Sequence, residues 1–350
     1  MHNLQLTEDQ DLVVDTVRKF VADTVAPAAL DADEHRKPLT AEFEALAELG
    51  VHGLLVAESN GGAGMGLLPF AAALEAVGAQ SASLARLWVE QAQCLAALEA
   101  AGRADLDPLI AGATGASFVG KEHGLVLADG KVTGTAAVVP GGAAAARFVL
   151  AARDGDGWVL AEVAADATAR TGLRALGLNS AACARVEFAG AAAEVIATGD
   201  AAGSAFARAA LVTHVGVAAC AVGSGVASIA AARKHASERI AFGKPLLVQE
   251  AVQRKLVECR RHVDAARQLV FHAARFADLG HDATDAALQA RIAAIDAMVL
   301  AADEAIQIHG GFGYTVEYHV ERHYRDGKML EVLDGGSDHL RDELARCQLA

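Results

Sequence analysis

The sequence has few aromatic residues and few cysteines. Its 350 residues include 2 Trp, 3 Tyr and 11 Phe, and its five cysteines are scattered, with no Cys-x-x-Cys pair. An odd number of widely spaced cysteines argues against a disulfide framework and against a structural zinc site. The same pattern is typical of the reducing cytoplasm, so we expect a cytoplasmic protein.

Basic residues are outnumbered by acidic ones. The chain has 30 Lys and Arg against 44 Asp and Glu, which gives a formal net charge of −14. An acidic surface repels phosphate backbones, so we expect no nucleic-acid partner. A local basic site can still hold a small anionic ligand.

The sequence also lacks a convincing membrane segment. Residues 209–232 carry no formal charge, but they consist mainly of Ala, Gly, Val and Ser and contain Thr213 and His214. This composition favours a helix buried in a bundle over a membrane span. The acidic, amphipathic N-terminus has no secretory apolar core, so we expect a soluble protein without membrane contact.

Alanine is abundant, with 82 copies, and it is the strongest helix former. Residues 1–110 and about 200–350 have helical periodicity, with Thr7 as an N-cap and a glycine-rich loop over residues 60–66. Between them lie short β-prone runs separated by Asp-Gly turns. These runs are residues 116–119, 124–127, 131–135, 147–152, 158–163 and 184–188.

Two segments of the C-terminal block contain most of the distinctive residues. In the first, Gly243 and Pro245 predict a turn after a helix that ends near Arg239. Taken by itself, Arg239 is a solvated helix-end residue and Phe242 a core anchor. In the second, the glycines of residues 310–313 let the backbone approach a ligand and expose amides to phosphates, although a glycine pair also simply ends helices.

Together these segments resemble the acyl-CoA dehydrogenase family. That family carries an Arg-x-x-Phe-Gly turn, a Gln-x-x-Gly-Gly-x-Gly-Tyr segment, an Arg-x-x-Arg-Asp segment and a carboxylate-Gly-Thr loop, in this order. The matching segments here are residues 239–243, 307–314, 322–326 and 334–336. The resemblance covers essentially the whole chain.

The resemblance implies a mainly α fold with an inserted small β domain. We expect an N-terminal helical domain over residues 1–111, a middle β-barrel or sandwich over 112–198 and a C-terminal four-helix bundle over 199–350. It also implies an FAD-dependent oxidoreductase that removes the α and β hydrogens of an acyl-CoA. A carboxylate takes the α proton, the flavin takes the β hydride, and hydrogen bonds polarise the thioester carbonyl.

By position in the family motifs, Asp334 is the expected catalytic base. It is one methylene shorter than the glutamate of many members, so Glu90 is a second candidate, and a chain without a working base is a third possibility. Thr213 and His214 are expected near the CoA, although His214 can equally be a buried, hydrogen-bonded histidine. We expect no metal at His309, His319, His323 and His339. The expected cofactor-binding residues are Arg239, Phe242, Gln249, Gln307, Gly310, Gly311 and Gly336.

The chain also departs from the family pattern. The segment that usually holds the flavin and acyl chain reads Ser117 to His123, a flavin-stacking Trp element is replaced by residues 137–140, and Gly336 replaces a threonine. The motifs that contact the FAD of a neighbouring subunit are therefore better preserved than those of the chain's own pocket. Lys121 and Trp158 are expected to be an ordinary surface cation and a packing residue.

The family's shared sites predict an oligomer, either a homotetramer or an α2β2 heterotetramer with a second acyl-CoA dehydrogenase-like chain. The heterotetramer agrees better with a chain that preserves its contribution to a neighbour's FAD site more than its own pocket. The family's heterotetramers suggest a bulky, cyclic or steroid-derived acyl group and an electron-transferring flavoprotein as acceptor. An alternative is a non-catalytic subunit that completes the FAD site of its partner. A flavin-binding relative with other chemistry, such as a monooxygenase, is a further alternative.

Overall fold

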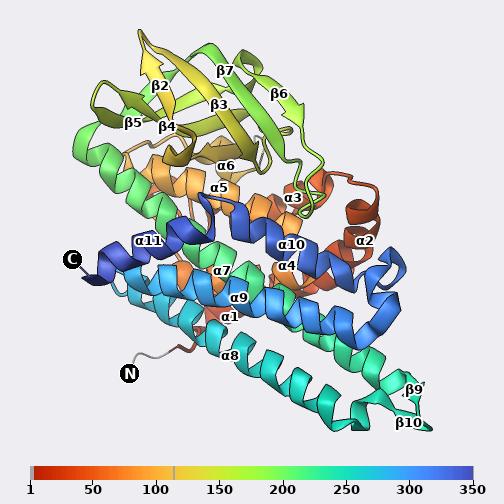
Figure 1. Ribbon diagram of the computed structural model, residues 1–350. Helices are drawn as coiled ribbons and strands as arrows, with labels where there is room; N and C mark the ends of the chain where they lie inside the picture. Colours follow the sequence, from red (N-terminus) through yellow and green to blue (C-terminus); the bar gives the residue numbers. More distant parts are fainter. Residues whose placement is uncertain (1–3, 113–114, 350) are drawn as a thin grey trace.

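A computed structural model describes residues 4–112 and 115–349 of the chain, which forms a helical body with a β sheet on one side (Figure 1). The expected mainly α fold with an inserted β region is confirmed. Thr7 is the N-cap of the first helix, as predicted, and the structure adds that it forms a capping box with Gln10. The N-terminal helices are α1 (Glu8–Phe20), α2 (Ala26–Glu34), α3 (Thr40–Glu48), α4 (Leu67–Gln80), α5 (Ala82–Ala100) and α6 (Asp107–Ile110).

The β region is one eight-stranded sheet with the order β6-β7-β3-β2-β4-β5-β8, and β1 pairs parallel with β4 beside β2. The six predicted runs correspond to β1–β5 and β7, whereas β6 and β8 were not predicted. Both are four residues long, and β6 is exposed throughout, so it lacks apolar alternation. The strands are β1 (Ala116–Val119), β2 (Leu125–Ala128), β3 (Lys131–Val139), β4 (Arg147–Asp154), β5 (Gly157–Ala164), β6 (Ala169–Gly172), β7 (Ala184–Ala192) and β8 (Glu194–Ala197).

Long helices follow the sheet. A two-stranded hairpin separates α7 from α8, and short 3-10 turns η7 (Gly310–Tyr314) and η8 (Val316–Tyr318) separate α9 from α10. The elements are α7 (Gly199–Glu238), β9 (Ile240–Ala241), β10 (Lys244–Pro245), α8 (Glu250–Asp278), α9 (Thr284–His309), α10 (Val320–Val332) and α11 (Gly336–Leu349). In Figure 1, α7 runs from the sheet at the upper left to the β9–β10 hairpin at the lower right.

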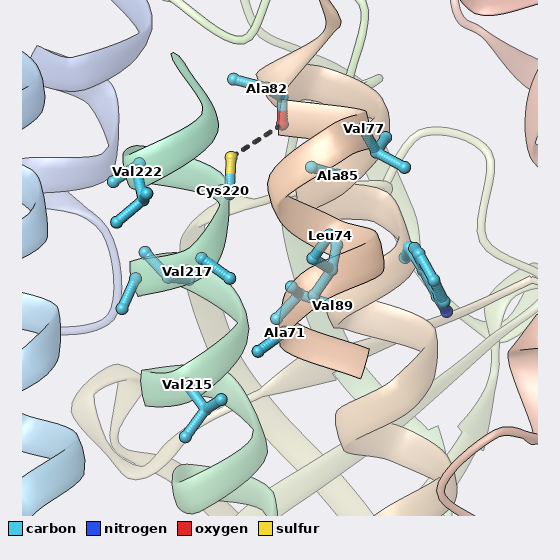
Figure 2. Close-up of a cluster of buried hydrophobic side chains, with 14 of the residues drawn as sticks. Ala71, Leu74, Val77, Ala82, Ala85, Val89, Val215, Val217, Cys220 and Val222 are labelled. Atoms are coloured by element: carbon cyan, nitrogen blue, oxygen red, sulfur yellow. Dashed lines mark hydrogen bonds between the residues drawn. The ribbon is translucent and has the colours of Figure 1, made fainter. Parts of the chain in front are cut away.

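The main core lies where α7 packs against α4 and α5 (Figure 2). A Cβ on Gly78 would lie 2.5 Å from the carbonyl oxygen of Cys220, and one on Gly223 would lie 2.0 Å from that of Glu75. The backbones of α4 and α7 are therefore in contact here, which explains why small residues dominate the faces where these two helices meet. By length and composition α7 could cross a membrane, but 72% of its most apolar window is buried inside the protein.

Candidate functional site

The two glycine-containing motifs meet at one end of the helical bundle. The ring of His235, near the end of α7, stacks on that of His309 at the end of α9, with centroids 4.2 Å apart. A small apolar cluster formed by α7, α9, α10 and the segment after β10 supports the same contact. We call residues 235–249 together with 307–319 the bundle end. It includes six of the predicted cofactor-binding residues: Arg239, Phe242, Gln249, Gln307, Gly310 and Gly311.

Most of these six residues are exposed. Phe242 is 97% exposed and has a φ of 53° in the turn between β9 and β10, so the alternative in which Phe242 anchors the core is wrong. At this exposure, the described residues cover almost none of its side chain. Arg239 and Gln307 are also exposed, and Gln249, the N-cap residue of α8, is half-buried.

The glycine pair leaves open space beside its backbone. No atom lies within 4 Å of the place where a Cβ on Gly310 or Gly311 would be. Gly310 has φ 63° and ψ −140°, a region of backbone space that is essentially restricted to glycine. Within residues 4–112 and 115–349, Arg239 forms no ion pair. Exposed amides, an unpaired guanidinium and an exposed ring are the groups that a dinucleotide needs for its phosphates and its bases.

Asp334 lies at the turn between α10 and α11, with a φ of 55°. Its Oδ1 accepts a hydrogen bond from Arg86 of α5 at 2.7 Å, and its Oδ2 accepts one from Arg291 of α9 at 2.8 Å. The arginine side chains are 1% exposed and that of Asp334 is 27% exposed. Burial by itself would raise the pKa of Asp334, but the two guanidinium groups outweigh it and hold the pKa below its ordinary value.

Glu90 belongs to the same network but is fully enclosed. Its Oε1 lies 2.7 Å from Arg86 Nη2, and its Oε2 accepts hydrogen bonds from Gln93 Nε2 at 2.8 Å and from the Phe118 amide at 2.9 Å. The side chain is 1% exposed, and burial raises its pKa to about 7. As a base candidate, Glu90 therefore has suitable proton affinity but no open face.

Thr213 and His214 are buried on α7 beside this network. Thr213 Oγ1 hydrogen-bonds to the carbonyl of Ala209 and to the side chain of Gln93. Arg291 Nη1 lies 3.3 Å from His214 Nδ1, and burial together with this guanidinium lowers the pKa of His214 to about 3. His214 is thus a neutral imidazole that accepts a hydrogen bond. Thr213 and His214 both lie close to Asp334, the predicted base. Arg86, Glu90, Thr213, His214, Arg291 and Asp334 are called the ion cluster below.

The ion cluster and the bundle end are separate sites on the same helices. Gln307 follows Arg291 by sixteen positions on α9, or ~24 Å at ~1.5 Å per residue. On α7, the step from His214 to His235 is 21 residues, or ~32 Å. Gly336 stays with Asp334 at the start of α11, apart from the other predicted cofactor-binding residues.

Sequence reasoning missed Arg86 and Arg291, the two residues that hold Asp334. A signal was present, since each is an isolated cation on a helix that is otherwise largely apolar or alanine-rich. Buried arginines require an anionic partner, so their position on such faces could have indicated an internal carboxylate. Their partner is 248 residues away from Arg86 and 43 away from Arg291, which local patterns do not reveal.

The segments that depart from the family motifs pack closely on α5. Ser117 Oγ donates a hydrogen bond to the Pro140 carbonyl at 2.8 Å, and the Ala116 amide donates one to Gln91 Oε1, also at 2.8 Å. Together with the bond from the Phe118 amide to Glu90, these contacts join β1 and the end of β3 to the helix that carries Arg86. The β sheet and the ion cluster are therefore built as one unit.

The fold, with two helical regions separated in the sequence by a β sheet, is that of the acyl-CoA dehydrogenases. Family models for the acyl-CoA dehydrogenase N-terminal and C-terminal domains match residues 7–107 and 203–349. A probable acyl-CoA dehydrogenase, YngJ of Bacillus subtilis (strain 168), is 29% identical over 98% of this chain and 99% of its own length.

Two solved structures have the same fold. Butyryl-CoA dehydrogenase from Megasphaera elsdenii superposes with a TM-score of 0.90 at 22% identity and covers 100% of both chains. A glutaryl-CoA dehydrogenase from Mycobacterium smegmatis in complex with FADH2 superposes with a TM-score of 0.87 at 19% identity, over 98% of this chain and 95% of that one.

The chain belongs to the acyl-CoA dehydrogenase family, whose members are FAD-dependent oxidoreductases. The residues of the bundle end fit the cofactor, because its glycines leave room for a phosphate beside the backbone and its arginine and aromatic side chains face outward. Those groups would hold part of an FAD. When bound, FAD supplies the acceptor for a hydride.

Proposed function

We propose that this chain is a subunit of an acyl-CoA dehydrogenase assembly in which each FAD site is shared between chains. The observation that carries the proposal is the separation of the two sites. The bundle end presents exposed groups expected to bind the cofactor, whereas the carboxylate expected to act as base is held by Arg291, which lies ~24 Å from Gln307 along α9. Because the bundle end and Asp334 are far apart in one chain, they cannot belong to the same site of that chain. A neighbouring chain is then needed to complete each of the two sites.

In this proposal, Asp334 removes the α proton of an acyl-CoA thioester. Its lowered pKa keeps the carboxylate ionised at neutral pH, as a base must be, and the turn between α10 and α11 leaves it partly accessible. The two arginines fix the direction in which its oxygens point. Arg86 and Arg291 are positioning residues in this scheme, since they act through Asp334.

A second candidate function is favoured by the same ion pairs. Both oxygens of Asp334 already accept a hydrogen bond from a buried guanidinium, and a carboxylate so stabilised resists protonation. Such a group holds helices together better than it accepts a proton from carbon. The chain would then be a non-catalytic subunit that contributes its bundle end to the FAD site of a partner in an α2β2 complex.

The flavin content of the chain, expressed alone and together with a second acyl-CoA dehydrogenase-like chain, tests the assembly. A yellow homotetramer with one FAD per chain would support a self-sufficient enzyme. A colourless chain that gains one FAD per heterodimer would support the shared site. Failure to retain flavin in either form, under conditions in which the chain is folded, would contradict the proposal.

The variant Asp334→Asn separates the two candidate functions. The amide keeps the shape of the side chain but cannot take up the proton. Loss of flavin reduction by acyl-CoA in the assembled protein, with flavin still bound, would identify Asp334 as the base. Unchanged reduction would identify the chain as the non-catalytic subunit.

The finer assignments also belong to the proposal. For the acyl group we propose a bulky, cyclic or steroid-derived chain, as in the family's heterotetramers, and for the acceptor an electron-transferring flavoprotein. We propose a cytoplasmic location because the scattered cysteines suit a reducing compartment. Flavin reduction by a series of acyl-CoA thioesters of increasing bulk would test the substrate class.

A further inference from the structure

The Arg-x-x-Arg-Asp motif of residues 322–326 fastens part of the β region to α10. The fastened segment is residues 173–183, which connect β6 to β7, and we call it the strap. Asp326 is 2% exposed, and its Oδ1 accepts a hydrogen bond at 2.6 Å from the amide of Leu178, in the middle of the strap. A buried backbone amide needs such an acceptor, so this bond fixes the strap to the helix.

The strap keeps a conformation that its own residues do not favour. Leu178 and Ala182 have φ values of 54° and 47°, and residues other than glycine rarely occupy this left-handed region. A Cβ on Gly177 would lie 2.2 Å from the carbonyl oxygen of Arg325, so the backbones of the strap and of α10 are in contact. Strained backbone of this kind persists only where its surroundings enforce it. The contacts with α10, that of Asp326 among them, therefore hold the strap in its arrangement.

The far end of the strap is bonded to the segment that is expected beside the flavin. The Gly141 amide donates a hydrogen bond to the Ala181 carbonyl at 2.7 Å, and the Ala143 amide donates one to the Ala182 carbonyl at 3.0 Å. Residues 137–140 directly precede Gly141 and occupy the place of the family's flavin-stacking element. Movement of the strap would therefore displace this end of β3.

Two helices in contact with the strap lead to Asp334. Asp326 lies on α10, and Asp334 is the second residue after that helix ends. The amide of Ser180 in the strap donates a hydrogen bond to Ser83 Oγ on α5 at 3.3 Å. Ser83 is three residues before Arg86 on the same face of α5, and Arg86 is one of the two arginines that hold Asp334. The strap is thus joined to the predicted base from two directions.

We propose that Asp326 is a positioning residue for the proton abstraction by Asp334. Through its bond to the strap it fixes the separation between Asp334 and residues 137–140, the space in which the α carbon of the acyl group has to lie. This inference rests on the proposed function, because it takes Asp334 as the base. The role requires an acceptor oxygen for the Leu178 amide and not a negative charge, so asparagine should replace Asp326 and alanine should not.

Reduction of the bound flavin by acyl-CoA in the assembled protein, followed by stopped flow, tests the proposal. The probe is the thioester that reduces the flavin fastest in the series of increasing bulk. Asp326→Ala should lower the limiting rate about tenfold and leave the Kd of the thioester unchanged, because a small displacement of the base slows proton transfer more than it weakens binding. Asp326→Asn should keep about half of the wild-type rate or more, since it retains an acceptor for the strap.

Glu75→Ala is the matched control for stability. It breaks the ion pair between Glu75 of α4 and Arg267 of α8, at 2.8 Å and with both side chains 20% exposed, which joins two helices other than α5 and α10. The variant should lower the Tm and leave the limiting rate unchanged. Hydrogen exchange of the strap amides gives a readout other than activity. It should rise about fivefold in Asp326→Ala and stay near the wild-type value in Asp326→Asn and Glu75→Ala.

If the strap of Asp326→Ala exchanges faster but the limiting rate is unchanged, Asp326 only stabilises the fold, and the inference is overturned while the proposed function stands. Equal rates in Asp326→Ala and Asp326→Asn would also overturn it, because the hydrogen bond would not be what positions the base. Should Asp326→Ala not fold, Ser83→Ala removes the other anchor of the strap and should slow reduction about threefold, and an unchanged rate again overturns the inference. A wild-type rate in Asp334→Asn would mean that the proposed base is wrong, and the inference would fail with it.

Discussion

Asp334 and Phe242 both lie at turns with a positive φ, 55° and 53°, but their surroundings are opposite. Asp334 has a hydrogen-bond partner for each oxygen, supplied by two buried arginines from two other helices. Phe242 is 97% exposed, and its ring is on the outside of a hairpin. Asp334 has its hydrogen-bond partners within its own chain, whereas the described residues leave the ring of Phe242 almost uncovered.

Because the ion cluster is buried and the bundle end is exposed, substitutions in the two regions should affect different properties of the protein. In the ion cluster, substitution of a charged residue removes a partner from another buried charge, so its first effect falls on stability. At the bundle end, most of the predicted cofactor-binding residues are exposed and make few contacts that a substitution could remove, so we expect substitutions there to change stability little and to act on the proposed cofactor binding. The same helices, α7 and α9, connect both regions, and this makes the comparison testable within one protein.

The largest expected effect is that of Asp334→Ala, which leaves two buried guanidinium groups without their shared anion. We expect the free energy of unfolding to fall by about 4 kcal/mol. Urea titration of the purified chain measures the change. Glu250→Ala is the matched control, since it breaks an ion pair with Arg254 in which both side chains are more than 80% exposed and should cost less than about 1 kcal/mol. Equal costs for the two variants would show that the ion cluster does not stabilise the fold.

Glu90→Gln changes how stability depends on pH. The pKa of Glu90 is raised to about 7 in the folded protein, so the folded state holds its proton more tightly than the unfolded state. That contribution is fully present below the unfolded pKa of about 4.5 and is lost as the pH rises towards 7. From pH 4.5 to 7.5, we expect the wild type to lose about 3 kcal/mol relative to Glu90→Gln.

Denaturation of both proteins across this pH range measures the difference. Glu187→Gln, at an exposed position on β7, serves as the control and should follow the wild type. Parallel pH profiles of wild type and Glu90→Gln would mean that Glu90 titrates normally, and that the enclosure of its carboxylate has no energetic consequence.

Much of the architecture could be predicted from the sequence because it depends on local patterns. The N-cap at Thr7, the end of α7 near Arg239 and six of the strands follow from periodicity and turn residues. The two missed strands are short, and one is fully exposed, so they are defined by their pairing partners and not by their own residues.

The site was predicted less completely, for a physical reason. The motifs gave the positions of Asp334 and of the glycine pair, but not the distance between them or what surrounds them. The ion cluster depends on contacts between α5, α9 and the turn after α10, which are far apart in the sequence. Taken by itself, the local sequence also allowed a buried Phe242, because an aromatic residue usually packs, whereas the side chain is almost fully exposed in the hairpin.

Gly310→Ala compares two adjacent glycines of the bundle end. Gly310 has a φ of 63° that alanine adopts only with strain, so we expect a loss of about 1–2 kcal/mol. Gly311 does not have a positive φ, and open space surrounds the position of its Cβ, which makes Gly311→Ala the control, at less than about 0.5 kcal/mol. Thermal unfolding of both variants measures the costs. Similar midpoints would indicate that the turn relaxes to accept a side chain.

The smallest expected effect on stability is that of Phe242→Ser. The ring is almost fully exposed in the single chain, so its removal should change the free energy of unfolding by less than about 0.5 kcal/mol. In the assembled protein the same substitution should lower FAD retention. The exposed ring is expected to pack on the FAD of a neighbouring subunit, and that contact would be lost. Flavin absorbance after gel filtration measures the retention, and Val257→Ser, which removes an apolar side chain that is 67% exposed on α8, is the control. If Phe242→Ser retains its full flavin content and its assembly, the exposed ring has no binding partner. Phe242 and Asp334 would then differ only in how far each is buried in the chain.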